Sequence, residues 1–435
     1  MNSNARKPSL VLNLPLIALV RRFLPGILAL APAFPLHAYS VLTHEAIIDS
    51  AWNQNIKPLL LKRFPNATRD ELLKAHAYAY GGCIIQDMGY YPFGSHFFSD
   101  LLHYVRSGDF VMNEIAASQD LSEYAFALGS LAHYAADNEG HSIAVNPSVA
   151  AEYPKLERKF GKSVTYADNP TAHLRVEFGF DVLQVAKGNY APQTYHDFIG
   201  FETSKDLLNR AFLQTYGVEL DDVFTDLDLA LGTYRRAVSS VIPEMTKVAW
   251  NLEKDQLQKD TPSITSRRFR YNLSRASYEK EWGRKYEKPG AGAAILAFLF
   301  RILPKVGPLK SAKPKPPTPE TNKWFEESFD KTLTLYRGLL AQAGAGGLQL
   351  VNTNFDTGKP TEPAAYKLAD NAYAKLAIEL ADKQGPAPDP KMRADIITYF
   401  HNRDLAFATK QDAKEWRKTV QAVDKLQSSL ANAGN

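Results

Sequence analysis

The chain has 435 residues, of which 45% are hydrophobic and 23% are charged, and this balance excludes a chain that is disordered throughout. Its formal net charge is +4, and four basic residues lie in its first 38 positions. Without those positions, 47 basic residues (51 minus 4) face 47 acidic residues. No overall basic field of the kind that attracts polyanions is therefore expected.

Residues 1–38 predict an export signal. Basic residues accompany two apolar stretches, and the second stretch ends at Ala38, an acceptable small-residue cleavage site before Tyr39. Prolines in and after the second stretch, and its short length, argue against the alternative of a membrane anchor. We therefore expect a signal peptide over residues 1–38 and a secreted or periplasmic protein, cleaved near Ala38/Tyr39.

Cys83 is the only cysteine of the chain, so an intramolecular disulfide is impossible. It stands in an apolar run, which favours a small buried side chain over a metal ligand. An exported protein of this length can be stabilised by core burial and by bound metal instead.

Apolar residues recur with helical spacing along the chain, and strand-like alternation is scarce. The first helix is expected over residues 44–62, and a capping box from Thr68 to Glu71 opens a second helix through Ala79. The glycines that follow, Gly81 and Gly82, are expected to interrupt it. Further helical periods cover residues 121–137, 171–187, 202–216, 220–253, 321–344, 363–384 and 411–431.

Composition divides the chain into three parts after the signal. Residues 39–260 are expected to form a catalytic domain and residues 320–435 a C-terminal helical region. Between them, residues 261–319 form a basic and apolar insertion or linker, because a run of basic residues precedes an apolar stretch and a Pro/Lys segment. The C-terminal region has the character of a packing appendage or a partner surface.

Histidines and acidic residues form two pairs with the spacing of metal ligands. His133 and Asp137 are four residues apart in a helical stretch, and His173 and Glu177 repeat that spacing in another. Residues at i and i+4 share one helix face, so an imidazole and a carboxylate can point at one ion. Zinc takes about four nitrogen or oxygen ligands, so other residues must complete each site. The candidates along the chain are His44, Asp87, His103 and His141.

This pattern resembles the zinc-dependent phospholipase C family, whose fold is shared with single-strand nucleases of the S1/P1 type. In that family the mature N-terminal residue binds zinc through its α-amine and carbonyl, and a histidine follows five residues on. Tyr39 and His44 have that spacing. The family's remaining ligands match, in order, Asp87, His103, His133, Asp137, His141, His173 and Glu177.

The resemblance implies an all-α, multi-helix bundle with an additional C-terminal helical region, and it implies three zinc ions. One zinc would be held by Asp87, His103, His133 and Asp137. A second would be held by His141, His173 and Glu177. A third would be held by Tyr39, His44 and a bridging Asp137. Beyond residue 260 the resemblance supplies no functional residue.

Two positions depart from the family pattern. The family usually begins with tryptophan, whereas this chain has Tyr39; because backbone atoms make the zinc bonds, metal binding is expected to persist. His96 competes with His103 for one ligand position. We favour His103, whose Leu-His-Tyr context and helical flank fit the motif, and leave His96 as a pocket or surface residue.

The resemblance implies an exported zinc-dependent phosphodiesterase, with phospholipase C as the expected activity. A water shared by two zinc ions has its pKa lowered toward about 7 and can attack phosphorus at neutral pH. The family's matching aspartate is the favoured base, which gives Asp87 the catalytic role.

The substrate is expected to be a phospholipid at a membrane surface. The balanced charge disfavours a polynucleotide groove. The apolar run 291–303, with basic flanks, suits contact with an anionic bilayer, and a buried helix is the alternative interpretation of that run. Aromatic residues beside Asp87, at positions 90, 91, 93, 97 and 98, could line an apolar entrance. Core packing and the stacking of bases are the other interpretations of this cluster. A nuclease or nucleotidase and a zinc-stabilised binding protein without turnover are the alternatives. The sequence leaves open the headgroup, C-type or D-type cleavage, the oligomeric state and any protein partner.

Overall fold

The computed structural model describes residues 41–187, 201–238, 242, 255, 258–259, 314–382 and 390–433. The predicted signal, Tyr39 and the predicted insertion as far as residue 313 lie outside the described residues. The expected division at residues 260 and 320 stays a prediction.

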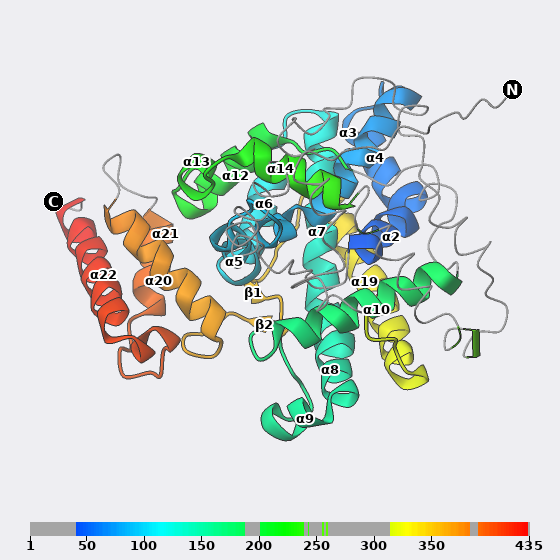
Figure 1. The fold of residues 1–435 in the computed structure, drawn as a ribbon. Helices are drawn as coiled ribbons and strands as arrows, with labels where there is room; N and C mark the ends of the chain where they lie inside the picture. The colour runs from blue at the N-terminus through cyan, green and yellow to red at the C-terminus, as the bar shows by residue number, and fades with distance from the viewer. Residues whose placement is uncertain are drawn as a thin grey trace, which may run out of the picture.

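The described residues are mainly helical, which confirms the predicted all-α fold (Figure 1). The N-terminal half contains α2 (Val41–Ala51), η1 (Trp52–Ile56), α3 (Lys57–Arg63), α4 (Arg69–Ile84), η2 (Ile85–Tyr90), α5 (His96–Tyr104), α6 (Ser107–Ala117), α7 (Leu121–Gly140), η3 (His141–Val145), α8 (Asn146–Glu152), α9 (Pro154–Phe160) and α10 (Pro170–Lys187). After these come α12 (Lys205–Tyr216), α13 (Leu220–Val223), α14 (Leu227–Arg236), α19 (Pro319–Ala345), α20 (Lys367–Asp382), α21 (Pro390–Tyr399), η7 (Ala408–Gln411) and α22 (Ala413–Ala433).

The capping box at Thr68 forms as predicted. The Thr68 hydroxyl accepts the backbone N–H of Glu71, and the Glu71 carboxylate accepts the N–H of Thr68 at 2.8 Å. The helix that it opens, α4, continues to Ile84 instead of ending at Ala79, so the predicted interruption at the glycine pair is wrong. Gly82 is needed there because it allows α4 to pack closely against α7.

Helices α4 and α7 pack at close range through reciprocal glycines. A Cβ on Gly82 would lie 1.8 Å from the carbonyl oxygen of Phe126, and a Cβ on Gly129 would lie 2.1 Å from that of Ala79. Only glycine permits such backbone approach without displacement. The contact brings the C-terminal end of α4, which leads to Asp87, against the middle of α7, which carries His133.

The sequence predicts one helix over residues 220–253, but the structure has two separate helices at the start of this range. Helix α13 ends at Val223 and α14 starts at Leu227. The carboxylate of Asp226 accepts the N–H of Leu229 at 2.9 Å, which caps the new helix and explains the break.

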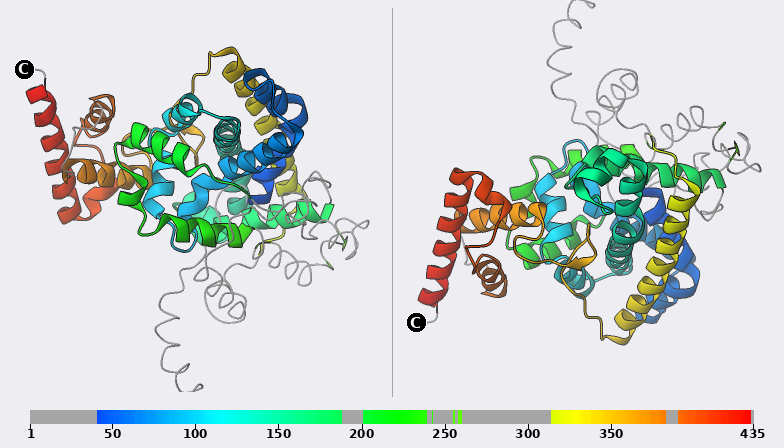
Figure 2. Two further views of the ribbon diagram at one scale, coloured as in Figure 1. Left: turned by 90° about the horizontal axis from the view of Figure 1, so that it is seen from above. Right: turned by 90° about the horizontal axis from the view of Figure 1, so that it is seen from below.

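The C-terminal elements surround the N-terminal bundle from two sides. Helix α19 runs beside α2 and η1 and also packs on α7 (Figures 1 and 2). Helices α20, α21 and α22 form a cluster at one end of the molecule, where α20 contacts α5. Of these, α21 was not predicted from the sequence. Within the part of the chain that the structure describes, no helix has both the length and the apolar character required to cross a bilayer.

A short hairpin connects α19 to α20. Strands β1 (Thr353–Asn354) and β2 (Lys359–Pro360) are antiparallel, with Thr353 opposite Pro360. The turn between them uses Gly358 at a φ of +65°, a conformation that favours glycine. Because β1 contacts α5 and α6, the hairpin reaches the middle of the N-terminal bundle.

Candidate metal centre

Helix α7 provides the central row of candidate ligands. His133 and Asp137 lie one turn apart, with His133 Nε2 3.1 Å from Asp137 Oδ2, as the i and i+4 spacing predicts. The π-helical turn η3 continues the row to His141, whose Nε2 is 3.9 Å from the same carboxylate oxygen. All of these side chains are buried.

Asp87 and His103 approach this row from η2 and α5. His103 Nε2 lies 3.3 Å from Asp87 Oδ1 and 3.5 Å from Asp137 Oδ2. Ligand atoms of Asp87, His103 and His133 all lie within 4.8 Å of one another, a grouping that could hold a metal ion. His96 is exposed at the start of α5, so the structure brings His103, and not His96, to the cluster.

His44 lies on the other side of Asp137. Its Nε2 is 3.4 Å from Asp137 Oδ1, and its ring stacks on that of His133 at a centroid distance of 4.5 Å. Asp181 anchors the N-terminal end of α2, the helix that carries His44. The Asp181 carboxylate accepts the backbone N–H groups of Leu42 and Thr43, both at 3.1 Å. A carboxylate at a helix N-terminus satisfies exposed donors and interacts favourably with the helix dipole. Tyr39, the partner implied for His44, is outside the described residues.

Helix α10 supplies the second i and i+4 pair. His173 Nδ1 lies 2.7 Å from Glu177 Oε1, and the His173 ring lies 5.1 Å from the ring of His141. His141, His173 and Glu177 form another buried group that could hold a metal ion. The structure therefore brings together each predicted ligand that it describes.

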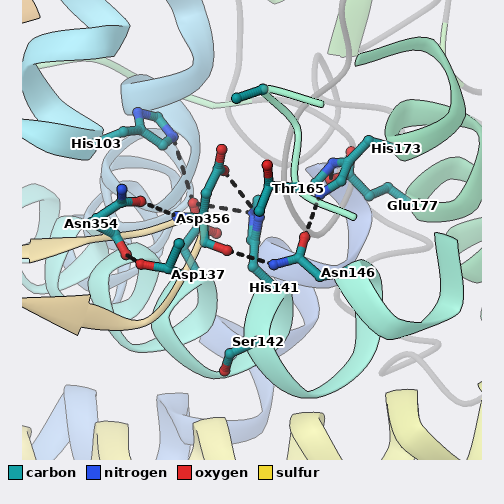
Figure 3. A network of polar contacts seen from close by, with 12 residues as sticks. His103, Asp137, His141, Ser142, Asn146, Thr165, His173, Glu177, Asn354 and Asp356 are labelled. Atoms are coloured by element: carbon teal, nitrogen blue, oxygen red, sulfur yellow. Dashed lines mark hydrogen bonds and ion pairs between the residues drawn. The ribbon is translucent and has the colours of Figure 1, made fainter. Parts of the chain in front are cut away.

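Several imidazoles are oriented by an acceptor on the side away from the cluster. Backbone carbonyls of Ser99 and Cys83 lie 2.8 Å and 2.9 Å from the Nδ1 atoms of His103 and His133. The side-chain oxygen of Asn146 lies 2.9 Å from His173 Nε2 (Figure 3). An imidazole that donates from one nitrogen presents the other as a lone pair, as metal ligands do. Cys83 contributes its carbonyl here, and its buried thiol is not among the grouped ligand atoms.

The electrostatics of the cluster suit a cation. Burial, with His141 beside it, lowers the pKa of His173 to about 3. Burial and the neighbouring His133 lower the pKa of His44 well below its ordinary value. Burial, reinforced by nearby carboxylates, raises the pKa of Glu177 well above its ordinary value. The imidazoles of His44 and His173 are thus held neutral. Although burial opposes it, the neighbouring carboxylates raise the pKa of His103, His133 and His141 above its ordinary value. A bound divalent ion would take the place of the protons that these imidazoles otherwise hold beside the carboxylates.

Many of the ligand atoms that face the centre of the cluster also lack a hydrogen bond from the part of the protein that the structure describes. Both carboxylate oxygens of Asp137 and of Glu177, and Nε2 of His133 and of His141, are buried without a hydrogen bond among the described residues. Buried polar groups are normally paired, because leaving them unpaired is costly. The residues therefore fit divalent ions whose ligands are nitrogen and oxygen, as zinc requires.

Sequence reasoning missed one acidic residue at this cluster. Asp356, in the hairpin turn, lies with Oδ1 3.1 Å from Nδ1 of His141. Its backbone carbonyl accepts the side-chain amide of Asn146 at 2.6 Å, so Asn146 links His173 to the hairpin (Figure 3). In the sequence, Asp356 stands in a polar turn far from the paired spacings, and no local pattern distinguishes it.

Of the interpretations of the aromatic residues after Asp87, burial favours core packing over an apolar entrance. Tyr90, Tyr91, Phe97 and Phe98 are buried in the protein core. The Tyr90 ring lies 5.7 Å from that of His103. Burial, with Asp87, Asp181 and Glu177 nearby, raises the pKa of the Tyr91 phenol well above its ordinary value. Phe93 is 46% exposed and adopts a positive φ of 63°. Core packing therefore accounts for most of this run.

A sequence model of the zinc-dependent phospholipase C family matches residues 43–226. This part of the chain is therefore similar to that family. Searches among curated proteins and among solved structures found no match. The matched region contains every described ligand candidate from His44 to Glu177, whereas Asp356 lies outside it. The match supports a zinc-using hydrolase and suggests phospholipids as the substrate class.

Proposed function

We propose that the protein is an exported phospholipase C that hydrolyses the headgroup phosphodiester of phospholipids with the help of three zinc ions. The observation that carries the proposal is the shared carboxylate of Asp137. One of its oxygens faces His44 at 3.4 Å, and the other faces His133 at 3.1 Å and His103 at 3.5 Å. Adjacent ligand groups that share one buried carboxylate suit a cluster of ions better than a single site.

The residues divide among the ions as the family resemblance implies. Asp87, His103, His133 and Asp137 would hold one zinc, and His141, His173 and Glu177 a second. His44, with Asp137 and the liberated terminus at Tyr39, would hold the third. Bound zinc would lower the pKa of a coordinated water, and its positive charge would offset negative charge on the phosphoryl oxygens.

We assign Asp87 as the general base that accepts the proton of the attacking water. Its carboxylate is 1% exposed, and Oδ1 faces His103 at 3.3 Å. The hydrogen bond that the Ser99 carbonyl accepts from the His103 ring holds that imidazole in place. Asp87 can thereby orient the water for attack on phosphorus opposite the leaving alcohol and accept its proton.

The lipid substrate is favoured over a polynucleotide by the family and by charge. The chain beyond position 38 has equal numbers of basic and acidic residues, so counterion release from many phosphates would contribute little. The predicted signal supports export, and with it a substrate outside the cytoplasm.

The test is a set of assays on the zinc-loaded chain that begins at Tyr39. Phosphatidylcholine, phosphatidylinositol and single-stranded DNA are compared under identical conditions, with products identified by mass. Diacylglycerol and a phosphorylated headgroup are the expected products. Phosphatidic acid would indicate D-type cleavage, and nucleotides as the main product would replace the lipid assignment with a nuclease. Zinc binding without turnover of any of these substrates would instead support a zinc-stabilised binding protein.

A further inference from the structure

The hairpin that contains Asp356 is fastened directly to the elements that carry the candidate ligands. The N–H of Phe355 donates to the carbonyl of His103 at 3.1 Å. The hydroxyl of Ser107 donates to the carbonyl of Thr353 at 2.7 Å. The hydroxyl of Thr361 donates to the carbonyl of Tyr104 at 3.0 Å. These bonds fix the hairpin at the end of α5, beside a predicted ligand.

The turn is also pressed against the C-terminal end of α7. A Cβ on Gly358 would lie 2.5 Å from the carbonyl oxygen of Asn138, so a side chain would force the two segments apart. The ring of Phe355 packs near His103 and His133, at centroid distances of 5.4 Å and 5.9 Å. The hairpin therefore forms one wall of the ligand cluster.

Two tyrosine hydroxyls hold the carboxylate of Asp356, and a third contact holds its backbone. It is fully buried, and Oδ2 accepts the hydroxyl of Tyr104 at 3.3 Å and that of Tyr366 at closer range. Its own N–H donates to the side chain of Asn354 at 3.0 Å. Oδ1 remains directed at Nδ1 of His141, 3.1 Å away.

We propose that Asp356 is a positioning residue of the metal centre, although it lies outside residues 43–226, which match the zinc-dependent phospholipase C family. With Oδ1 3.1 Å from Nδ1 of His141, its carboxylate would accept the Nδ1–H of that imidazole when zinc binds, and so fix the tautomer that presents Nε2 to the second zinc. This inference rests on the proposed zinc function. It makes the C-terminal hairpin part of the active centre.

The test is the zinc affinity of the full mature chain, measured by competition with a chromophoric chelator. Asp356→Asn keeps the size of the side chain but weakens the acceptor for His141. Loss of an outer-sphere partner of this kind costs about 10–100-fold in metal affinity, and we expect that loss for one ion per chain. Tyr366→Phe retains the carboxylate but removes one of its donors, and a smaller loss in the same direction is expected.

Asp395→Asn is the matched control. Asp395 also accepts a tyrosine hydroxyl, that of Tyr373 at 3.0 Å, but it lies on α21 and faces no candidate ligand. Its substitution is expected to leave all zinc affinities unchanged. A second readout is the proton resonance of His141 Nδ1–H in the zinc-loaded protein, which should move upfield in Asp356→Asn and not in the control.

The outcomes separate this inference from the proposed function. A wild-type chain that binds no zinc would refute the proposed function itself. A wild-type chain that binds zinc, with Asp356→Asn binding every ion equally tightly and the His141 resonance unmoved, would overturn the inference alone. If Asp356→Asn fails to fold, Tyr366→Phe decides, because unchanged affinity in that variant contradicts an oriented carboxylate.

Discussion

Oδ1 of Asp137 lies 3.4 Å from Nε2 of His44, while Oδ2 of the same carboxylate lies 3.1 Å from Nε2 of His133. Burial alone would raise the pKa of Asp137, but the imidazoles of His133, His141 and His44 lower it below its ordinary value. The carboxylate is thus charged and shared between two groups of histidines. A residue in that position can bridge two ions, and it links the first helix to the centre of the bundle.

Asp137→Asn is expected to reduce the zinc content of the mature chain by more than one ion. The amide offers one neutral oxygen in place of a charged bridge, so both groups of ligands lose a donor. Because even outer-sphere substitutions lower activity about 10–100-fold, hydrolysis should fall by more than about 100-fold. Zinc per chain is measured by atomic emission after gel filtration. Full zinc content in Asp137→Asn would show that the carboxylate does not bridge.

Asp87→Asn separates metal binding from catalysis. If Asp87 accepts the proton of the attacking water, turnover should fall by about 10²–10⁴-fold even in preparations that keep their zinc. The measurement is kcat with saturating substrate, normalised to the zinc content of each preparation. Asp395→Asn serves as the control for a carboxylate-to-amide change elsewhere in the chain. A zinc-replete Asp87→Asn protein with wild-type kcat would end the assignment of the base.

Removal of the predicted signal should add a zinc ion. The α-amine of Tyr39 cannot ligate while it is part of a peptide bond, so a chain extended by Ala38 should hold one ion fewer than the chain that begins at Tyr39. Both forms are compared for zinc per chain at the same free zinc concentration. Equal zinc contents would contradict a terminal ligand and leave His44 with other partners.

Glu114 provides a prediction on stability away from the cluster. It is fully buried on α6, and burial raises its pKa to about 8, against a value near 4.5 in the unfolded chain. The folded state therefore binds a proton that the unfolded state releases, and stability falls as pH rises from about 4.5 to about 8. Glu114→Gln removes this penalty and should raise the free energy of unfolding at pH 7 by about 1–3 kcal/mol.

The measurement is urea unfolding of wild type and Glu114→Gln at pH 5, 6.5 and 8 with saturating zinc in every sample. The difference between the two proteins should grow with pH, because only the wild type must protonate or bury a charge at this position. A difference that stays constant over that range would show that Glu114 titrates normally.

Local patterns predicted much of the fold, and they failed where distant contacts decide the outcome. The capping box at Thr68 is a local signal and formed as expected. The glycines after Ala79 were interpreted as a break, yet they permit the contact of α4 with α7, which depends on Phe126, far along the chain. Packing thus overrode the local preference, as it often does for glycine in helices.

The candidate site divides in the same way. His133 with Asp137, and His173 with Glu177, follow from helical spacing, because their positions relative to each other are set within one turn. Asp356 could not be predicted, since its place beside His141 depends on a hairpin held by bonds to α5 and α8. No local sequence pattern predicts that two segments so far apart in the chain come into contact.

The central claim is that this buried cluster holds zinc, and the most direct test is a crystal structure of the mature, zinc-loaded chain with anomalous data at the zinc edge. Anomalous peaks are expected between Asp87, His103 and His133, between His141, His173 and Glu177, and between His44 and Asp137. Zinc bound only at surface positions, with these side chains paired among themselves, would contradict it.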